Sequence, residues 1–199
     1  MATASIVTIG NELVSGDTVN TNGSWLAGRL EALGVDVLLI VALPDDEERV
    51  AAFVRTEAAG VDVVLVTGGL GGTPDDITRE AIAAAFGVSQ EEQPAVAETL
   101  RARFRADPDY VTRWAQLPAG SRALENPLGG APGFVVGNVY VLPGLPSEMK
   151  AMFDTVAEEL RAGTPIGSWR RTYRTTESRI VAVLQAANCR CRGGAGRSS

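Results

Sequence analysis

Four glycines within five residues constrain this chain more than any other feature of its sequence. They occupy residues 68–72 as Gly-Gly-Leu-Gly-Gly and follow the apolar run at 61–66, which is typical of a buried strand. Glycines let a backbone approach a ligand closely, and a tight turn needs one of them rather than four. The loop therefore predicts a binding site that includes Gly68, Gly69, Gly71 and Gly72.

The residues after the glycines predict the start of a helix. Thr73 is expected to cap that helix, Pro74 suits its first position, and Asp76 completes a capping box with Thr73. A strand, a glycine loop and a helix N-terminus together gather N–H groups around an anion such as phosphate. Asp75 and Asp76 add carboxylates, which repel phosphate unless a divalent cation such as Mg²⁺ lies between them. The loop thus favours a phosphate site with a bound metal.

The composition excludes several classes of function. A net charge of −6 argues against a nucleic-acid partner, because that binding needs a basic surface. The sequence has no histidine, which excludes histidine acid/base catalysis and His-ligated zinc. Cys189 and Cys191 are expected to be reduced thiols. No signal peptide or membrane-length apolar run can be recognised, so we expect a cytoplasmic protein without a membrane partner.

The order of predicted elements gives the fold class. Strands and helices alternate through strand 5–9, helix 21–33, strand 36–41, helix 45–59, strand 61–66 and a helix ending at 86. This alternation is typical of an α/β domain with a largely parallel sheet. A Gly-Asn turn at 137–138 predicts a hairpin over 135–142 and hence an antiparallel edge.

The rest of the chain is divided as follows. Helices are expected over 91–105 and from Pro146 to about 161, with a loop across 108–117. We predict an α/β domain over 1–165 and a partial C-terminal extension over 166–187, with a strand at 171–175 and a helix at 177–187. Residues 188–199 are rich in Arg, Gly, Cys and Ser and are predicted to be a disordered tail.

Polar loops follow several of the predicted strands, at the end of the sheet where α/β proteins bind ligands. Besides the glycine loop, the candidate ligand-binding residues are Gly10, Glu12, Asn22, Thr73, Gly144 and Ser147. Asp45 stands in the loop after the second strand. Purely structural interpretations remain open: Asp45 and Asp76 could be helix caps, as could Asn20 and Asn22, and Glu12 a solvated charge. The position of all these loops on one rim favours a site.

At this point the motifs resemble a known family. Residues 67–81, Gly-Asn-Glu-Leu at 10–13 and Asn-Thr-Asn at 20–22 are similar to the molybdopterin-binding (MoaB/MogA-like) domain. Pro-Asp-Asp at 44–46, and the motifs at 131–134 and 142–149, resemble the N-terminal domain of CinA, a competence/damage-inducible protein. The resemblance covers about residues 4–162.

The resemblance implies a three-layer α/β/α sandwich with a mostly parallel sheet, assembled as a dimer or trimer. Relatives in molybdenum-cofactor synthesis bind molybdopterin and adenylylate it with MgATP, and CinA-type members are associated with metal-dependent ADP-ribose pyrophosphatase activity. By this resemblance Asp45 and Asp76 are the catalytic candidates. Asp45, Asp75 and Asp76 are the candidates to hold the divalent metal.

Several alternatives stay open at this stage. The ligand is a phosphorylated small molecule, which the sequence does not identify as molybdopterin, ATP or ADP-ribose. A non-catalytic binding module and a structural oligomer compete with an enzyme. Gly72 stands where CinA-type loops commonly have proline, which is expected to loosen the loop. Arg113 to Gln116 replace a Lys-Gln-Ala-like motif, which leaves a basic contact there open. The amidase activity of full-length CinA is not expected of this chain.

Overall fold

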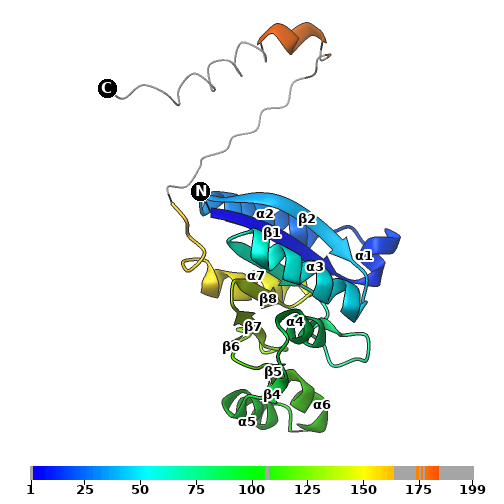
Figure 1. Ribbon diagram of the computed structural model, residues 1–199, viewed down its shortest axis with the longest axis vertical. Helices are drawn as coiled ribbons and strands as arrows, with labels where there is room; N and C mark the ends of the chain where they lie inside the picture. Colours follow the sequence, from blue (N-terminus) through cyan, green and yellow to red (C-terminus); the bar gives the residue numbers. More distant parts are fainter. Residues whose placement is uncertain (1, 106–107, 164–173, 175, 177, 184–199) are drawn as a thin grey trace. The chain divides into compact units, whose positions relative to one another are not determined.

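The computed structural model describes residues 2–105, 108–163, 174, 176 and 178–183 (Figure 1). Its contacts divide the chain into two units, Met1–Ile166 and Gly167–Ser199. In the second unit, residues 178–183 are helical, inside the helix predicted over 177–187. The strand predicted at 171–175 lies, except for residue 174, outside the described residues, as does the tail at 188–199.

A six-stranded sheet in the order β2-β1-β3-β8-β7-β6 forms the centre of the first unit. Its strands are β1 (Ala2–Ile9), β2 (Val35–Leu43), β3 (Val63–Thr67), β6 (Arg122–Leu124), β7 (Gly133–Val136) and β8 (Val139–Leu142). The first four strands of that order run parallel, whereas β6 and β7 pair antiparallel. The mostly parallel sheet with an antiparallel edge hairpin is therefore confirmed.

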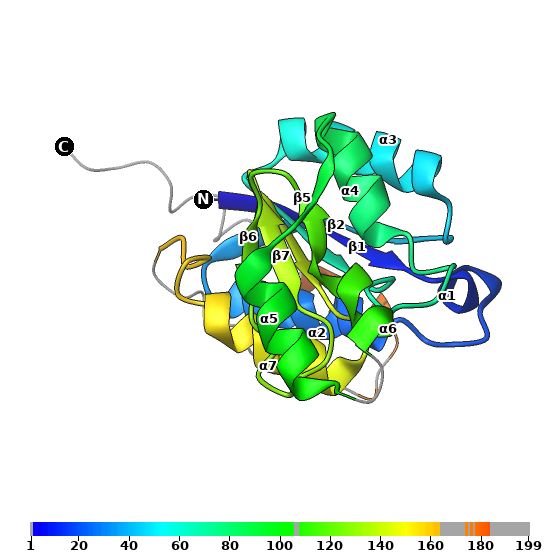
Figure 2. The same cartoon turned by 90° about the horizontal axis from the view of Figure 1, so that it is seen from below.

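Helices cover both faces of this sheet (Figure 2). They are α2 (Thr21–Ala32) and α7 (Pro146–Val156) on one face, and α3 (Glu47–Gly60) and α4 (Thr78–Phe86) on the other. Successive side chains of β1 point to opposite faces of the sheet. Ile6 packs with Leu26 and Phe153 on one face, and Val7 packs with Val54 and Ile82 on the other. Burial of these two apolar layers gives the predicted three-layer α/β/α sandwich.

A smaller group of elements follows α4. It consists of β4 (Gln90–Glu92), α5 (Pro94–Arg103), α6 (Pro108–Thr112), a 3₁₀ turn (Arg113–Ala115) and β5 (Gln116–Pro118). The helix expected from residue 91 thus begins at Pro94, because 90–92 pair with β5, and 108–117 are mostly regular rather than a loop. Trp114 links the elements of this group through edge-on ring contacts with Phe104 and Tyr110.

No helix among the described residues is long and apolar enough to cross a bilayer.

Candidate functional site

The parallel strands end at one edge of the sheet, where two cavities flank the glycine loop. The first, of about 140 Å³, includes Glu12, Asn22, Gly68 and Gly144 in its lining. The second, of about 300 Å³, is lined in part by Gly69, Gly71, Asp76 and Gly144. The structure therefore brings these predicted residues together. Neither cavity has Gly10, Asp45, Gly72, Thr73, Asp75 or Ser147 in its lining.

Two glycines are required where the loop leaves β3. Gly68 has a φ of 108°, and a Cβ there would lie 2.2 Å from the carbonyl oxygen of Ile9. Gly69 has a φ of 63°, and its Cβ would lie 2.3 Å from Oγ1 of Thr78. Both positions combine a left-handed backbone with close contacts, so a side chain would displace the loop.

Four consecutive carbonyls of the loop point toward α4. Thr78 donates its hydroxyl to the oxygen of Gly68 at 2.8 Å and its N–H to that of Gly69 at 3.2 Å. Arg79 donates Nη1 to the oxygen of Leu70 at 2.8 Å and Nη2 to that of Gly71 at 2.6 Å. In a trans peptide the N–H points opposite to the carbonyl. The N–H groups of residues 69–72 are therefore directed away from α4.

Three of those four N–H groups have no hydrogen-bond partner. The N–H of Gly71 donates to Oδ1 of Asp76 at 2.8 Å. Within the described part of the chain, the N–H groups of Gly69, Leu70 and Gly72 make no hydrogen bond. Adjacent unpaired N–H groups form an anion-binding concavity.

Asp76 closes the loop instead of joining a helix cap. Its Oδ2 accepts the N–H of Thr73 at 2.9 Å and also the Thr73 hydroxyl, so both carboxylate oxygens bond within the loop. The prediction that Thr73 caps a helix beginning at Pro74 is wrong, because α4 begins at Thr78. Only half of the predicted capping box is present: the Asp76 carboxylate accepts the N–H of Thr73, whereas the N–H of Asp76 donates to the backbone carbonyl of Thr73 and closes a turn that precedes the helix.

Arginines that the sequence reasoning did not select support the loop. Arg79 is fully buried, and no described carboxylate forms an ion pair with it. Burial lowers the pKa of its guanidinium. Arg113 donates to the carbonyl oxygens of Thr73 at 2.7 Å and Asp76 at 2.9 Å, and pairs with Glu80 at 3.1 Å. Arg113 thus supplies the basic contact that the sequence left open.

The loop after β8 is joined to those after β1 and β3. Thr67 donates its hydroxyl to the carbonyl of Pro143 at 2.6 Å, and Asn22 donates Nδ2 to that of Gly144 at 2.8 Å. Asn20 rather than Asn22 caps α2, through the N–H of Gly23. The amide of Asn22 is therefore part of the site.

Asp45, like Asn22, does not cap a helix. The cap of α3 is Asp46, whose Oδ1 accepts the N–H of Arg49 at 3.0 Å, so the helix predicted from residue 45 begins at Glu47. Asp45 accepts the N–H of Asn11 at 2.9 Å, and Asn11 accepts the N–H of Asp45 at 3.3 Å. This reciprocal pair joins the loops after β1 and β2.

The carboxylates at the rim interact by charge. Burial raises the pKa of Asp45, and the charges of Glu12, Asp75 and Asp76 raise it further. The Thr73 hydroxyl and Arg113 lower the pKa of Asp75. Across the described residues, no three acidic, cysteine or histidine side chains are close enough to enclose a metal ion. The predicted set of Asp45, Asp75 and Asp76 is therefore not a ready-made metal cage.

Comparison with known proteins now decides the family. A model of the family described as "probable molybdopterin binding domain" matches residues 5–162, the part of the chain that forms this fold and rim. The chain belongs to this family. The match confirms the resemblance inferred from the motifs, and nearly the same residues carry it.

Relatives place the chain in the CinA-like branch of the molybdopterin-binding family. A CinA-like protein from Parasynechococcus marenigrum is 40% identical over 166 residues, which are 79% of this chain and 40% of the relative. A protein from Pyrobaculum calidifontis is 43% identical over 80% of this chain and 64% of its own length. The chain thus spans less than half of that CinA-like relative and less than two thirds of the Pyrobaculum protein.

Solved structures agree with this assignment. The CinA protein of unknown function from Thermoplasma acidophilum has a TM-score of 0.76 and 31% identity, covering 80% of this chain and 99% of its own. The molybdopterin biosynthesis enzyme MoaB from Thermus thermophilus has a TM-score of 0.52 at 21% identity, over 83% of this chain and all of its own. The second likeness shows the shared fold alone.

Proposed function

We propose that this domain binds a pterin or nucleotide through its phosphate or pyrophosphate at the glycine loop. The observation that supports the proposal is the set of unpaired N–H groups on Gly69, Leu70 and Gly72, all directed away from α4. The buried charge of Arg79 behind the loop, which no described carboxylate pairs with directly, favours an anion in front of it. Gly10, Glu12, Asn22, Thr73, Gly144 and Ser147 complete the proposed ligand-binding set.

A divalent metal is part of the same proposal. Mg²⁺ is commonly held by one or two carboxylates together with substrate phosphates, and it needs no all-protein cage. Asp45 and Asp75 are the candidates for that arrangement, since both follow strands that end at this rim and the charge of Asp75 contributes to the raised pKa of Asp45. Asp76 adds negative charge while it holds the loop. Mg²⁺ bound there would neutralise the charge that develops on the phosphate oxygens.

The reaction we propose is hydrolysis of a nucleotide pyrophosphate of the ADP-ribose type. Water attacks one phosphorus atom, the bridging P–O bond breaks, and the departing phosphate keeps the electron pair, so ADP-ribose gives AMP and ribose 5-phosphate. In this proposal Asp45 orients that water and accepts its proton. Asp76 keeps the loop N–H groups directed at the phosphate.

Two further statements belong to the proposal. The long edge strand β2 exposes Leu38 and Ile40, which supports a homo-oligomer, dimer or trimer, built on this edge. A cytoplasmic location stays a prediction from the sequence. Adenylylation of molybdopterin is the alternative chemistry: the pterin phosphate attacks ATP, a new pyrophosphate bond to AMP forms, and inorganic pyrophosphate leaves. A binding module without turnover is the other alternative.

The test compares three phosphorylated ligands with adenosine, which has no phosphate. Melting temperature is measured with inorganic pyrophosphate, ADP-ribose, ATP and adenosine, each with and without Mg²⁺. A ligand at a hundred times its Kd stabilises by about 2.7 kcal/mol, which raises the Tm by several degrees. We expect this shift for the phosphorylated ligands, and release of AMP from ADP-ribose only with Mg²⁺. An adenosine shift equal to that of ADP-ribose would overturn the proposal.

A matched pair of glycine variants locates the binding. Gly69→Ala places a Cβ against Thr78 at a left-handed φ, whereas Gly28→Ala, in the middle of α2, meets no atom within 4 Å. We expect Gly69→Ala to abolish the pyrophosphate shift and Gly28→Ala to keep it. Equal shifts for both variants would place the anion elsewhere.

A further inference from the structure

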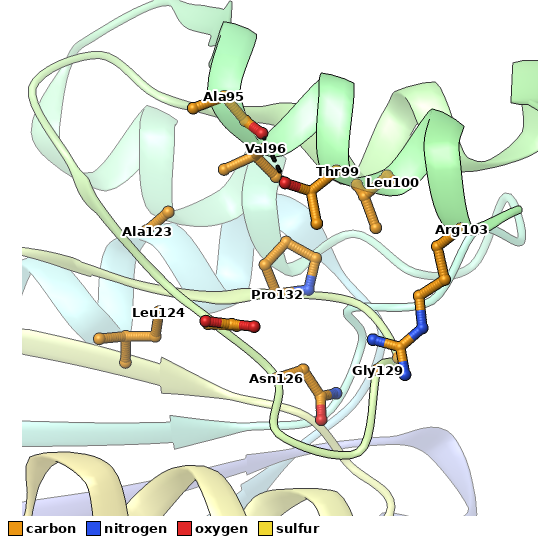
Figure 3. Close-up of a pocket in the computed structure, with 12 residues that line it drawn as sticks. Ala95, Val96, Thr99, Leu100, Arg103, Ala123, Leu124, Asn126, Gly129 and Pro132 are labelled. Atoms are coloured by element: carbon orange, nitrogen blue, oxygen red, sulfur yellow. Dashed lines mark hydrogen bonds between the residues drawn. The ribbon is translucent and has the colours of Figure 1, made fainter.

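A third cavity, of about 280 Å³, lies between α5 and the connection from β6 to β7 (Figure 3). Val96 and Leu100 line it from the helix, and Leu124 and Pro132 line it from the opposite side. Leu100 and Leu124 are buried, so the floor is formed by the fixed core of the fold. Its volume is close to the lower end of small-molecule sites in proteins.

One cation lies at the end of this largely apolar cavity, whose lining also includes Glu125. Figure 3 shows Arg103 extending from α5 across to Gly129. A Cβ on Gly129, which has a φ of 85°, would collide with the guanidinium, so glycine is what lets Arg103 lie there. Among the described residues, its guanidinium donates one hydrogen bond, to the carbonyl of Leu128 at 3.5 Å, and pairs with no carboxylate.

The neighbouring arginine on the same helix is different. Arg101 forms an ion pair with Glu92 at 2.9 Å and does not line the cavity. A guanidinium at the end of a largely apolar cavity, with no ion-pair partner among the described residues, is arranged to receive a planar anionic group.

We propose that this cavity is a second small-molecule site, for a ligand with an apolar body and one terminal anionic group, a carboxylate, sulfonate or phosphate. The body lies along Val96, Leu100 and Pro132, and the anion pairs with Arg103. Thr99 gives no polar recognition, because its hydroxyl donates to the carbonyl of Ala95 at 2.9 Å.

The second site is separate from the glycine rim. The 125–132 segment stands between the two, with Gly130 in the lining of both this cavity and the larger rim cavity. Asn126 fixes that segment by donating to Glu148 at 2.9 Å and to the carbonyl of Ala131 at 3.0 Å. Both sites can therefore be filled together, and a rim ligand does not displace an occupant of the second cavity.

The experiment titrates the full chain with two fluorescent probes of similar shape. 8-Anilinonaphthalene-1-sulfonate carries one sulfonate, and N-phenyl-1-naphthylamine is its uncharged counterpart. Arg103→Met is expected to weaken the sulfonate probe about tenfold, the size of a charged hydrogen-bonded contact. The same variant leaves the neutral probe within about twofold of its wild-type affinity. Arg101→Met is the control and changes neither.

Thr99→Phe provides a second variant, on the exposed side of α5, that fills the cavity without touching the core. We expect it to weaken both probes at an unchanged melting temperature. Added pyrophosphate leaves both titrations unchanged. Wild-type sulfonate affinity in both Arg103→Met and Thr99→Phe, or displacement of the probe by pyrophosphate, overturns the second site. Neither result bears on phosphate binding at the glycine loop.

Discussion

The two halves of the rim are built in opposite ways. The glycine loop, residues 68–76, is held from α4 by hydrogen bonds to four successive carbonyls, internally by Asp76, and from the far side by Arg113. The acidic loops, residues 10–18, which include the short helix α1 (Asn11–Ser15), and residues 44–46, are joined to each other by the reciprocal pair of Asn11 and Asp45, and most of their side chains are exposed. The glycine loop is therefore held rigid before a ligand binds, whereas the acidic loops can adapt to one.

The difference matches two tasks in handling phosphate. Backbone N–H groups stabilise an anion most when they are already oriented, so that no reorganisation is needed on binding. Carboxylates that repel one another gain most from a cation, and can close around it when it arrives. We therefore expect damage to the glycine loop to cost both folding and binding. Damage to the acidic loops should cost binding alone.

The largest effect is expected for Arg79→Met. Methionine leaves the buried carbonyls of Leu70 and Gly71 without donors, each costing about 1–3 kcal/mol, partly offset because no charge is buried any longer. We expect a loss of about 3 kcal/mol in the free energy of unfolding, measured in urea, and loss of the pyrophosphate-induced Tm shift.

Arg55→Met is the matched control. Arg55 also donates to two backbone carbonyls, those of Ala84 and Ala85 at 2.8 and 3.0 Å, but at the exposed surface, where water can replace it. Its loss should cost less than about 1 kcal/mol and leave binding intact. Equal destabilisation by the two variants would mean that the glycine loop is not specially braced.

Much of the glycine loop could be predicted from the sequence, but the two arginines that hold it could not. The glycines, the preceding strand and Asp76 are local patterns that follow from backbone sterics and side-chain acceptors. Arg79 shows no such signal, because an arginine in the first turn of an amphipathic helix ordinarily faces solvent. Arg113 lies far along the chain, and its contact depends on the packing of Trp114, which no local rule supplies.

Asp76→Asn is expected to have the next largest effect. Both oxygens of Asp76 accept hydrogen bonds within the loop, from the N–H groups of Gly71 and Thr73 and from the Thr73 hydroxyl. Asparagine keeps one acceptor and turns an NH₂ group toward donors. We expect a loss of about 2 kcal/mol in unfolding free energy and at least tenfold weaker pyrophosphate binding by calorimetry. Wild-type stability would show that the loop does not depend on this carboxylate.

The adjacent aspartates at 45 and 46 show where the sequence was ambiguous. Either can cap a helix that begins after Pro44, and the choice depends on where β2 ends and how Asn11 approaches across the sheet. The motif predicted that Asp45 belongs to the site. Only the tertiary structure shows that Asp46, and not Asp45, caps the helix. A larger shift separates the predicted start of α4 at Pro74 from its observed start at Thr78, because Asp76 satisfies loop donors before the helix begins. The fold class did not depend on these details, since alternating apolar segments determine it.

The smallest effect on stability is expected for Asp45→Asn. Asp46→Asn is its matched control, and we expect the two variants to differ most clearly in their response to Mg²⁺. Burial and the charges of Glu12, Asp75 and Asp76 raise the pKa of Asp45 in the folded state. Between its unfolded pKa, about 4, and that raised value, the folded state binds the proton more tightly, so the stability that Asp45 contributes falls as pH rises through this window. At pH 7 its carboxylate therefore opposes folding slightly. Asparagine still accepts the N–H of Asn11 and removes the repulsion.

We therefore expect Asp45→Asn to raise the unfolding free energy at pH 7 by about 0.5 kcal/mol, with the gain vanishing toward pH 4. The same variant should lose the Mg²⁺-dependent part of the ADP-ribose response, since it removes a charge that the cation needs. Asp46→Asn should do neither, because asparagine caps helices as well as aspartate does and Asp46 faces the N–H of Arg49. If both variants lost the Mg²⁺ response equally, the acidic loops would act through their summed charge. If Asp45→Asn kept that response and destabilised the fold, Asp45 would belong with the rigid half of the rim.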